Sequence, residues 1–500
     1  MKNKLILTLL FCCGAMGLCA QNSMTFSYPD LAVNKTLICA NSGTGHDLVY
    51  YNDTNTRAPC FFYHIHANGT TRRFERLPIV GGNTPFPHNN IDTVFVVKDM
   101  VIGSGYCYFC GLIHIHTVWE TPIVDPLDRS REYIDTCFGF LGRFPMNEIT
   151  DMSNHLINAK YVIIPITKSL KRLKIESGAR RLTAVALNHL GDNGFILLDD
   201  IGTAIQYQCL YPQDADENIT DIAYTTTSLV TVSEFRNDDN RFAIRNGNIA
   251  SAYGAPWNLS YFNIRYDFNT SGLNTVTLPR PFPPTAEYTH DIRITEIPET
   301  EKVVVAYEGV GGGFDISCES DNYNTNVYKL DLQVVNPAMS VQPTMEDAQV
   351  VSLDKVYAKG LQGIKYLPYD ATVALLYKNT GNTYGPAGQI QYPTLSSYGQ
   401  KNYQTIDILT LPSMDSYGYG ELHLIGWNTA SLHPTHFFQD IQNLTPSCFP
   451  VLPKCYTEEL RTTEASVDIS RMTQKLGFVE WSDIQLEEKS MTNKRPCNAQ

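Results

Sequence analysis

Long apolar runs are missing from the 500-residue chain beyond its first twenty residues. A helix needs roughly 20 consecutive apolar residues to cross a bilayer, so the sequence predicts no transmembrane segment after the leader. Basic side chains are outnumbered, with 38 Lys and Arg against 51 Asp and Glu and a net charge of −13. Because nucleic-acid binding depends on basic side chains that neutralise phosphates, this balance argues against a nucleic-acid partner.

Diagnostic catalytic motifs are also absent. Gly103-Ser104-Gly105 lacks the spacing of the G-x-S-x-G nucleophile elbow. The glycine-rich residues 309–313 lack the Lys and the Ser or Thr with which a P-loop holds phosphates and magnesium. Acidic pairs such as Asp199-Asp200 do not by themselves define the carboxylate separation that a glycosidase needs. The sequence therefore favours a non-catalytic protein over an enzyme.

The first twenty residues have the layout of a secretory signal peptide. Lys2 and Lys4 precede an apolar run over residues 5–11, and the segment ends at Leu18-Cys19-Ala20. We expect cleavage after Ala20, with residues 21–500 exported to the periplasm, the outer surface or the medium. A lipid anchor is disfavoured, because Leu18 stands where a lipoprotein signal needs a small residue.

Ten of the thirteen cysteines follow this leader, and export permits disulfides. Cys448 and Cys455 flank a proline-punctuated turn, so we predict a disulfide between them. Cys107 and Cys110 stand in an aromatic segment typical of a strand, where residues three apart point to opposite faces. We therefore expect neither a disulfide nor a shared metal at that second pair.

Strand-forming residues dominate the chain, with 29 Tyr and 22 Phe, and 33 Gly and 27 Pro punctuate it. Pairs of short apolar strands recur. A polar turn separates the two strands of each pair, and the pair begins with residues rich in Thr or Asp. The predicted pairs are residues 91–97 with 106–115, 149–152 with 161–166, 182–187 with 194–198, 219–224 with 228–235, 291–297 with 302–307, 363–367 with 372–377, 421–427 with 435–441, and 466–469 with 477–481.

Helical spacing is predicted only at residues 168–173 and 457–463. Residues 168–181 also carry six basic side chains and one glutamate, which we interpret as a solvated loop or short helix. The sequence thus predicts an all-β protein with little helix.

A small antiparallel sheet cannot shield both of its faces from water, but a ring of such sheets covers them. The spacing of the pairs brackets the period of propeller blades, and seven blades fit the length best, with six or eight also allowed. The phrases Tyr106-Cys-Tyr-Phe-Cys-Gly111 and Thr220-Asp-Ile-Ala-Tyr224 stand in blade-like positions. On these, the chain resembles secreted bacterial β-propeller proteins with loosely repeating blades.

This resemblance implies a single propeller-like domain over residues 21–500, and tandem β-sandwiches are the alternative fold. We expect ring closure to pair residues 48–65 with strands from the C-terminal end. The repeated Asp-box of sialidase-like propellers is absent, which weakens a glycosidase interpretation.

One Cys/His spacing occurs twice. Cys60, His64 and His66 follow C-x3-H-x-H, and Cys110, His114 and His116 repeat it. Residues two and four apart share one face of a strand, and zinc and copper bind such side chains. A metal site that joins both copies is one hypothesis. Two similar strands with buried cysteines are the simpler interpretation, and a disulfide between Cys60 and Cys110 is a third.

Calcium is a further possible ligand, because two acidic loops partly match calcium-binding turns. One runs over residues 214–218, and the other, over residues 315–326, follows the glycine-rich stretch. The first has Ile219 where a calcium loop needs glycine. We expect no required cofactor, with calcium or zinc as the alternatives.

Aromatic side chains near the C-terminal end suggest a binding surface. Tyr and Trp present flat apolar faces with a polar edge, which suits contacts with glycans or proteins. The candidate ligand-binding residues are Tyr398, Tyr403, Tyr417, Tyr419 and Trp427. The leading hypothesis is an exported, non-catalytic binding or scaffold protein that recognises a protein or glycan at the cell envelope. A glycan hydrolase or lyase and a metal-binding protein are the alternatives.

Overall fold

The computed structural model describes residues 23–27, 36–43, 46–52, 59–65, 70–76, 91–120, 131–151, 157–176, 178–236, 238–250, 258–260, 264–269, 292–310, 323–332, 344–352, 361–367, 372–378, 388–392, 402–406, 413–417, 421–427, 434–440, 459–464, 467–469, 474–481, 484–490 and 492–494. Every regular element within them is a β-strand except the short helix α2, Met146–Thr150, so the prediction of an all-β protein is confirmed. No helix in this part of the chain is long and apolar enough to cross a membrane.

The described strands form seven antiparallel sheets, which we number along the chain. Sheet 1 holds β2 (Thr36–Gly43), β3 (His46–Asn52), β4 (Pro59–Ile65), β5 (Thr70–Arg76) and β34 (Ile484–Ser490). Sheet 2 holds β6 (Ile91–Gly103), β7 (Tyr106–Glu120), β8 (Arg131–Pro145), β9 (Ala159–Ile164) and β33 (Val479–Trp481). Sheet 3 holds β10 (Thr167–Ile175), β11 (Arg181–Asn188), β12 (Asn193–Asp200), β13 (Ala204–Pro212), β31 (Val467–Ile469) and β32 (Gln474–Gly477).

The remaining sheets follow the same plan. Sheet 4 holds β14 (Glu217–Tyr224), β15 (Ser228–Phe235), β16 (Asp238–Ala250), β17 (Asn258–Ser260), β18 (Ile264–Asn269) and β30 (Glu459–Glu464). Sheet 5 holds β19 (Ile292–Glu296), β20 (Lys302–Val310), β21 (Tyr323–Asp331) and β22 (Thr344–Ser352). Sheet 6 holds β23 (Leu361–Leu367), β24 (Thr372–Lys378), β25 (Gly388–Tyr392) and β26 (Asn402–Ile406). Sheet 7 holds β27 (Ser413–Tyr417), β28 (Glu421–Trp427), β29 (Pro434–Asp440), β1 (Ser23–Ser27) and β35 (Thr492–Lys494).

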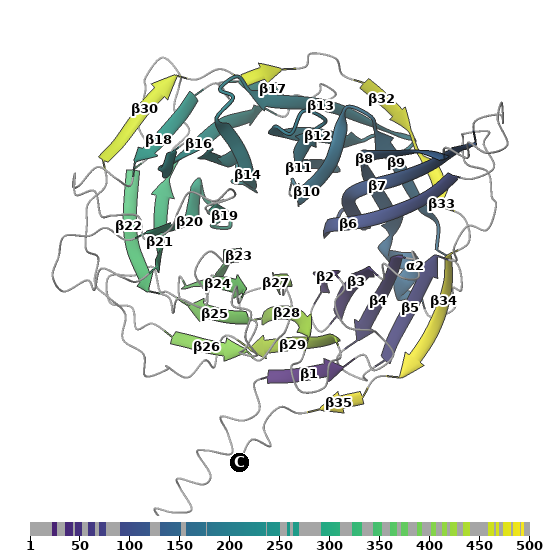
Figure 1. The fold of residues 1–500 in the computed structure, drawn as a ribbon. Coiled ribbons are helices and arrows are strands. Elements are labelled where there is room, and N and C mark those ends of the chain that lie inside the picture. Colours follow the sequence, from purple (N-terminus) through teal and green to yellow (C-terminus); the bar gives the residue numbers. More distant parts are fainter. Residues whose placement is uncertain are drawn as a thin grey trace, which may run out of the picture.

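The sheets lie one after another around a common centre (Figure 1). The innermost strands are β2, β6, β10, β14, β19, β23 and β27, and each contacts the next one along the chain. Strand β27 also contacts β2, so the contacts pass through all seven sheets and return to the first.

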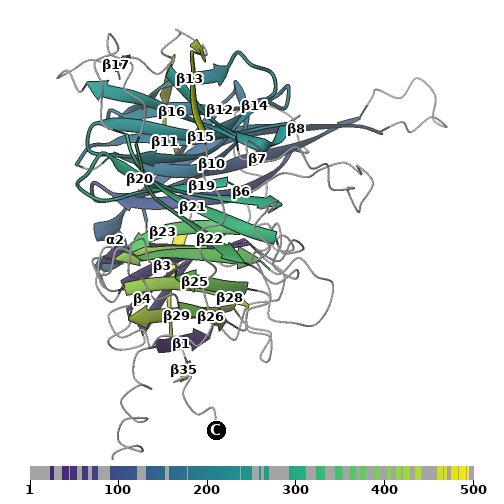
Figure 2. The same cartoon turned by 90° about the vertical axis from the view of Figure 1, so that its left-hand side faces the viewer.

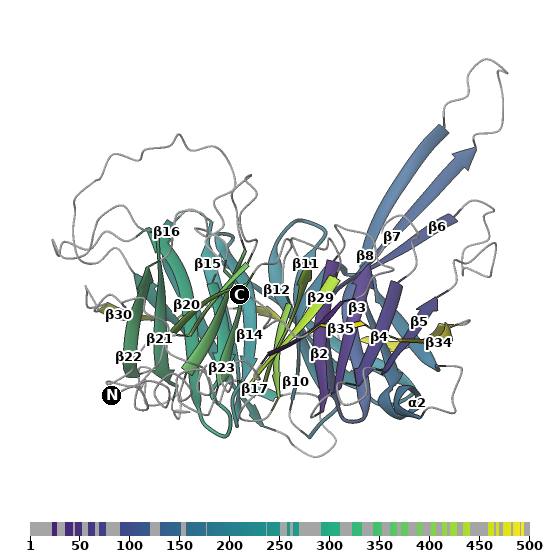
Figure 3. The same cartoon turned by 90° about the horizontal axis from the view of Figure 1, so that it is seen from below.

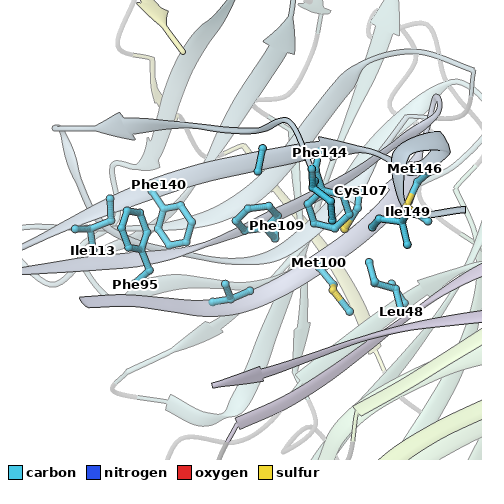
Figure 4. Packing of buried hydrophobic residues seen from close by; sticks show 14 of the residues in the cluster. Leu48, Phe95, Met100, Cys107, Phe109, Ile113, Phe140, Phe144, Met146 and Ile149 are labelled. Carbon is cyan, nitrogen blue, oxygen red and sulfur yellow. The ribbon is translucent and has the colours of Figure 1, made fainter. Parts of the chain in front are cut away.

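Apolar side chains fill the interfaces between neighbouring sheets. Between sheets 1 and 2, Leu48 packs with Met100, Cys107 and Phe109 (Figure 4). A second cluster joins sheets 2 and 3, and others join sheets 3 and 4, 4 and 5, and 5 and 6. The strands that line these interfaces are buried on both faces, which explains near-continuous apolar sequences such as residues 194–198.

The N-terminal strand is built into the last sheet. Strand β1 pairs antiparallel with β29, with Thr25 opposite Phe437, and β35 lies on its other side (Figure 1). The described parts of residues 48–65, which we expected to pair with strands from the C-terminal end, instead lie in β3 and β4, which pair with each other inside sheet 1. The strand nearer the N-terminus, β1, pairs with the C-terminal strand β35.

Residues 459–494 form what we call the C-terminal belt. Its strands pair with the outer edges of five sheets in turn: β30 with β18, β31 and β32 with β13, β33 with β9, β34 with β5, and β35 with β1. The belt thus visits sheets 4, 3, 2, 1 and 7. It covers edges that would otherwise expose unpaired backbone groups.

Six of the predicted strand pairs are confirmed as neighbours: β6 with β7, β11 with β12, β14 with β15, β19 with β20, β23 with β24, and β28 with β29. Two are wrong. Residues 149–150 end helix α2 and pair with no strand, whereas β31 and β33 belong to different sheets. The sequence of a short apolar strand does not indicate which sheet edge it pairs with.

Both predicted helices are wrong, because residues 168–173 lie in β10 and residues 459–463 in β30. In β10, Leu170 and Leu173 are buried three residues apart, which imitates helical spacing. A β-bulge between Lys171 and Lys174 inserts the extra residue, and Arg172 takes a φ of 57° there. The basic run therefore lies largely in an inner strand and not in a loop or helix, whereas its predicted solvation is confirmed at Lys168, Lys171 and Arg180, which are exposed.

Candidate functional site

Two aspartates repeat the same contact between inner strands. Asp99 lies at a β-bulge in β6, accepts the N–H of Met100 at 2.9 Å, and accepts the N–H of Leu173 in β10 at 2.8 Å. Asp221 lies at a β-bulge in β14 and accepts the N–H of Ile222 at 2.9 Å and that of Ile294 in β19 at 3.2 Å. Each carboxylate therefore ties its own sheet to the next one.

Basic side chains accompany these aspartates at the centre. Burial raises the pKa of Asp99, and Arg172 and Lys174 only partly oppose that shift. Partial desolvation lowers the pKa of Lys171, and the positive charges of the neighbouring Arg172 and Arg293 lower it further. The Lys171 side chain is nevertheless exposed. Arg293 donates from Nε to the carbonyl of Gln362 in β23 at 3.2 Å, which extends the ties to sheet 6.

Asp99→Ala is expected to lower the free energy of unfolding by about 1–2 kcal/mol, because the N–H of Leu173 loses its acceptor. Asp99→Asn keeps an acceptor oxygen and should cost less. Since folding raises the pKa of Asp99, its contribution is largest at low pH and falls as the pH rises through that raised pKa. Urea titrations of the three proteins at several pH values test this; equal stability of the alanine and asparagine variants would contradict it.

A buried ion pair joins sheets 2 and 3. Arg143 binds the carboxylate of Asp200 through Nη1, and Tyr108 donates its hydroxyl to the same oxygen at 2.8 Å. The Arg143 guanidinium also lies 4.1 Å from the ring centroid of Phe478, next to the belt strand β33. These contacts link sheet 2, sheet 3 and the C-terminal belt.

A second buried ion network lies within sheet 4. Glu217 accepts from Arg245 Nε at 2.8 Å and Nη2 at 2.6 Å, and from Arg265 Nη1 at 2.9 Å. Ser233 donates its hydroxyl to Glu217 at 2.9 Å, and Asp214 lies 3.3 Å from Arg265. Residues 214–218, one of the two candidate calcium loops, thus hold an arginine of the chain itself beside their carboxylates. The other calcium loop, residues 315–326, lies largely outside the described residues.

The repeated Cys/His positions fall in different sheets: Cys60 and His64 in β4, and Cys110, His114 and His116 in β7. His66 lies outside the described residues. Cys110 packs in the cluster between sheets 2 and 3, on the side away from sheet 1 and its strand β4. Among the His, Cys, Asp and Glu side chains that are described, no group of three or more could hold a metal.

The cysteines of β7 follow strand alternation. Cys107 packs toward sheet 1 and Cys110 toward sheet 3, so their predicted opposite orientation is confirmed. Both are free, buried thiols, so the disulfide between Cys60 and Cys110 is not formed. Burial raises the pKa of both thiols, which makes them poor nucleophiles.

The aromatic candidates are only partly described. Tyr403 lies in β26, Tyr417 in β27 and Trp427 in β28, which places them on the neighbouring sheets 6 and 7. Tyr398 and Tyr419 lie outside the described residues, as do Cys448 and Cys455. The binding surface and the disulfide that these residues suggest stay predictions.

Sequence reasoning missed a turn that presents an apolar side chain to solvent. Leu190, between β11 and β12, is 88% exposed. Asn188 Oδ1 accepts the N–H groups of Leu190 and Asp192, each at 2.8 Å, and Arg236 donates to the carbonyl of Gly191 at 2.9 Å. We call residues 188–192 the Leu190 turn. These hydrogen bonds fix the backbone of the turn on either side of Leu190.

Neighbouring groups brace the Leu190 turn from the side of sheet 2. His189 hydrogen-bonds the carbonyl of Pro165 through Nε2 at 2.9 Å, and its ring meets that of Phe138 edge-on at 5.8 Å. Phe138 belongs to β8, which pairs with β7 in a ribbon that extends well beyond the sheets (Figures 2 and 3). Leu190 therefore lies near the base of this ribbon.

The chemistry of the described part is mainly structural. Asp200, Glu217 and Asp221 are buried, and each accepts hydrogen bonds from arginine, tyrosine or backbone groups of the chain. A general acid or base must reach a substrate proton, whereas these carboxylates are occupied with folding contacts. No known protein-family model matches the chain, and no curated protein is significantly similar to it in sequence.

Proposed function

We propose that the chain is a seven-bladed β-propeller in which each sheet is one blade, and that it is an exported, non-catalytic protein that binds a partner at the cell envelope. The cycle of contacts among the seven inner strands supports the propeller. In tandem sandwiches, sheets would pack in separate pairs, whereas here each inner strand has two neighbours. Strand β1, paired beside β29, is the closing strand of the last blade.

The observation that carries the binding function is the Leu190 turn. An apolar side chain exposed to 88% and held by its own hydrogen-bonded turn loses little freedom when it is buried by a partner. The partner is a protein or a glycan, and the leading expectation is a protein pocket that accepts an aliphatic side chain. Because burial of a leucine side chain contributes about 1.5–3 kcal/mol, substitution of Leu190 should produce a measurable loss of affinity.

Leu190→Asp is expected to weaken binding at least tenfold, since burial of a leucine side chain contributes about 1.5–3 kcal/mol. The chain from Gln21 onward is mixed with a cell-envelope fraction of its native host, and the bound fraction is measured by sedimentation over a concentration series. Val479→Asp is the matched control, because Val479 is also an exposed apolar residue, at 47%, but lies in the belt strand β33.

Saturable binding that Leu190→Asp weakens and Val479→Asp leaves intact supports the proposal. Protease treatment of the envelope should abolish binding if the partner is a protein, and periodate treatment should abolish it if the partner is a glycan. Absence of saturable binding, or equal loss with both variants, would overturn the proposal.

A further inference from the structure

The ribbon of β7 and β8 has a strand edge without a neighbour. β8 pairs with β7 over its full length, from Arg131 to Pro145. On its other side, β8 pairs with β9 only from Gly139 to Arg143. Among the described strands, none pairs with residues 131–138 on that side, so their outward N–H and C=O groups remain available to another strand.

This edge lacks two of the features that usually prevent strand addition, proline and lysine. Residues 131–138 read Arg-Glu-Tyr-Ile-Asp-Thr-Cys-Phe, and their charges, Arg131, Glu132 and Asp135, are of both signs. Half of residues 131–138 are β-branched or aromatic, which favours extended structure. The ribbon also extends away from the sheets, so another molecule reaches the edge without meeting them (Figures 2 and 3).

We propose that the edge of β8 pairs antiparallel with the same edge of a second copy of this chain, centred on Tyr133. A two-fold axis through such a pair places Arg131 opposite Asp135 of the second copy, and Asp135 opposite Arg131. Opposite charges at directly facing positions stabilise antiparallel strands. The β7 and β8 strands of the two copies then lie in one continuous sheet, which β6 extends on either side.

A second copy suits this edge better than an unrelated strand. The charge pattern is self-complementary about Tyr133, which an arbitrary partner strand would not match. At residues 131–133 the ribbon is also only two strands wide, because β6 reaches no further than Thr117 of β7, and a two-stranded segment is only marginally stable in water until further strands join it. The pairing is independent of the envelope partner proposed for the Leu190 turn.

Charge reversal tests the register. The chain from Gln21 onward should be a dimer in sedimentation velocity at micromolar concentration. Arg131→Asp places like charges at both facing positions and should raise the dimer dissociation constant about tenfold. The double change Arg131→Asp with Asp135→Arg restores opposite charges and should restore the dimer. A protein that is monomeric throughout, or a double variant as weak as the single one, would overturn the proposal.

Cross-linking gives a second readout that does not depend on charge. Facing residues of antiparallel strands lie about 4.5–5.5 Å apart between Cα atoms, within reach of a disulfide. Tyr133→Cys should therefore yield an intermolecular disulfide under mild oxidation. Val118→Cys is the control, since Val118 faces Tyr133 from β7 on the inner side of the same ribbon. Equal cross-linking of both variants, or none of Tyr133→Cys, would count against the proposed dimer.

Discussion

A chain that ends at residue 458 is expected to lose cooperative folding. The missing belt contributes the outermost strand or strands of five sheets, β30 to β35. Each backbone hydrogen bond contributes about 0.5–1.5 kcal/mol net, and loss of six strands is comparable to the 5–15 kcal/mol that holds a typical domain together. Far-ultraviolet circular dichroism during thermal unfolding should show a broad, early transition or none.

Truncation after residue 494 is the matched control for the belt. This shorter deletion removes only residues that follow β35, so every belt strand remains. Its unfolding transition should coincide with that of the full chain. If the chain that ends at residue 458 unfolded as sharply and at the same temperature as this control, the belt would have no part in holding the sheets together.

Glu217→Gln should lower the free energy of unfolding by about 3–5 kcal/mol, because it removes the buried charge that neutralises Arg245 and, together with Asp214, Arg265. Both the side chain of Glu217 and that of Arg245 are fully buried. Urea unfolding followed by tryptophan fluorescence measures the loss. Ser233→Ala is the matched control, since it removes a neutral donor to the same carboxylate and should cost only about 1 kcal/mol.

The pH dependence of this network has a defined sign. Burial alone would raise the pKa of Glu217, but hydrogen bonds and charges from Arg245 and Arg265 outweigh it, so folding lowers the pKa below its ordinary value of 4.5. The stabilisation is therefore complete above pH 4.5 and is lost as the pH falls through the lowered pKa. The difference between the unsubstituted protein and Glu217→Gln should shrink in that acidic range. A difference that stays constant down to the acid transition would show that Glu217 does not act through its charge.

Strand content and local hairpins were predictable from the sequence because both depend on near neighbours. The apolar runs at residues 182–187 and 194–198, with a short polar turn between them, form β11 and β12 as expected. Each such hairpin brings together residues close in the chain, so turn residues and strand propensity are enough to specify it.

Pairings between distant segments were not predictable in the same way. Nothing local in residues 484–490 indicates that β34 joins β5, about four hundred residues earlier. The bulge in β10 also places two buried leucines three residues apart, a spacing typical of a helix, so the strand was not recognised from the sequence. Only the arrangement of the neighbouring sheets fixes such choices.

The functional residues were predictable in part. Asp221 stands in the blade-like phrase Thr220-Asp-Ile-Ala-Tyr224, but its hydrogen bond with Ile294 depends on the next sheet. Leu190 has no sequence signal, because a leucine in a polar turn is indistinguishable from one that folds back onto the core. Its exposure follows from the hydrogen bonds that hold the Leu190 turn.

The proposed closure of the seven sheets into a ring, with β1 beside β29, is tested most directly by a designed disulfide, Thr25→Cys with Phe437→Cys. These residues face each other across the two strands, although they lie at opposite ends of the chain. We predict that peptide mapping finds the two cysteines joined under mild oxidation, whereas Thr25→Cys with Tyr403→Cys in β26 of sheet 6 stays unjoined. Efficient formation of the second disulfide, or failure of the first in a folded protein, would contradict the closed ring.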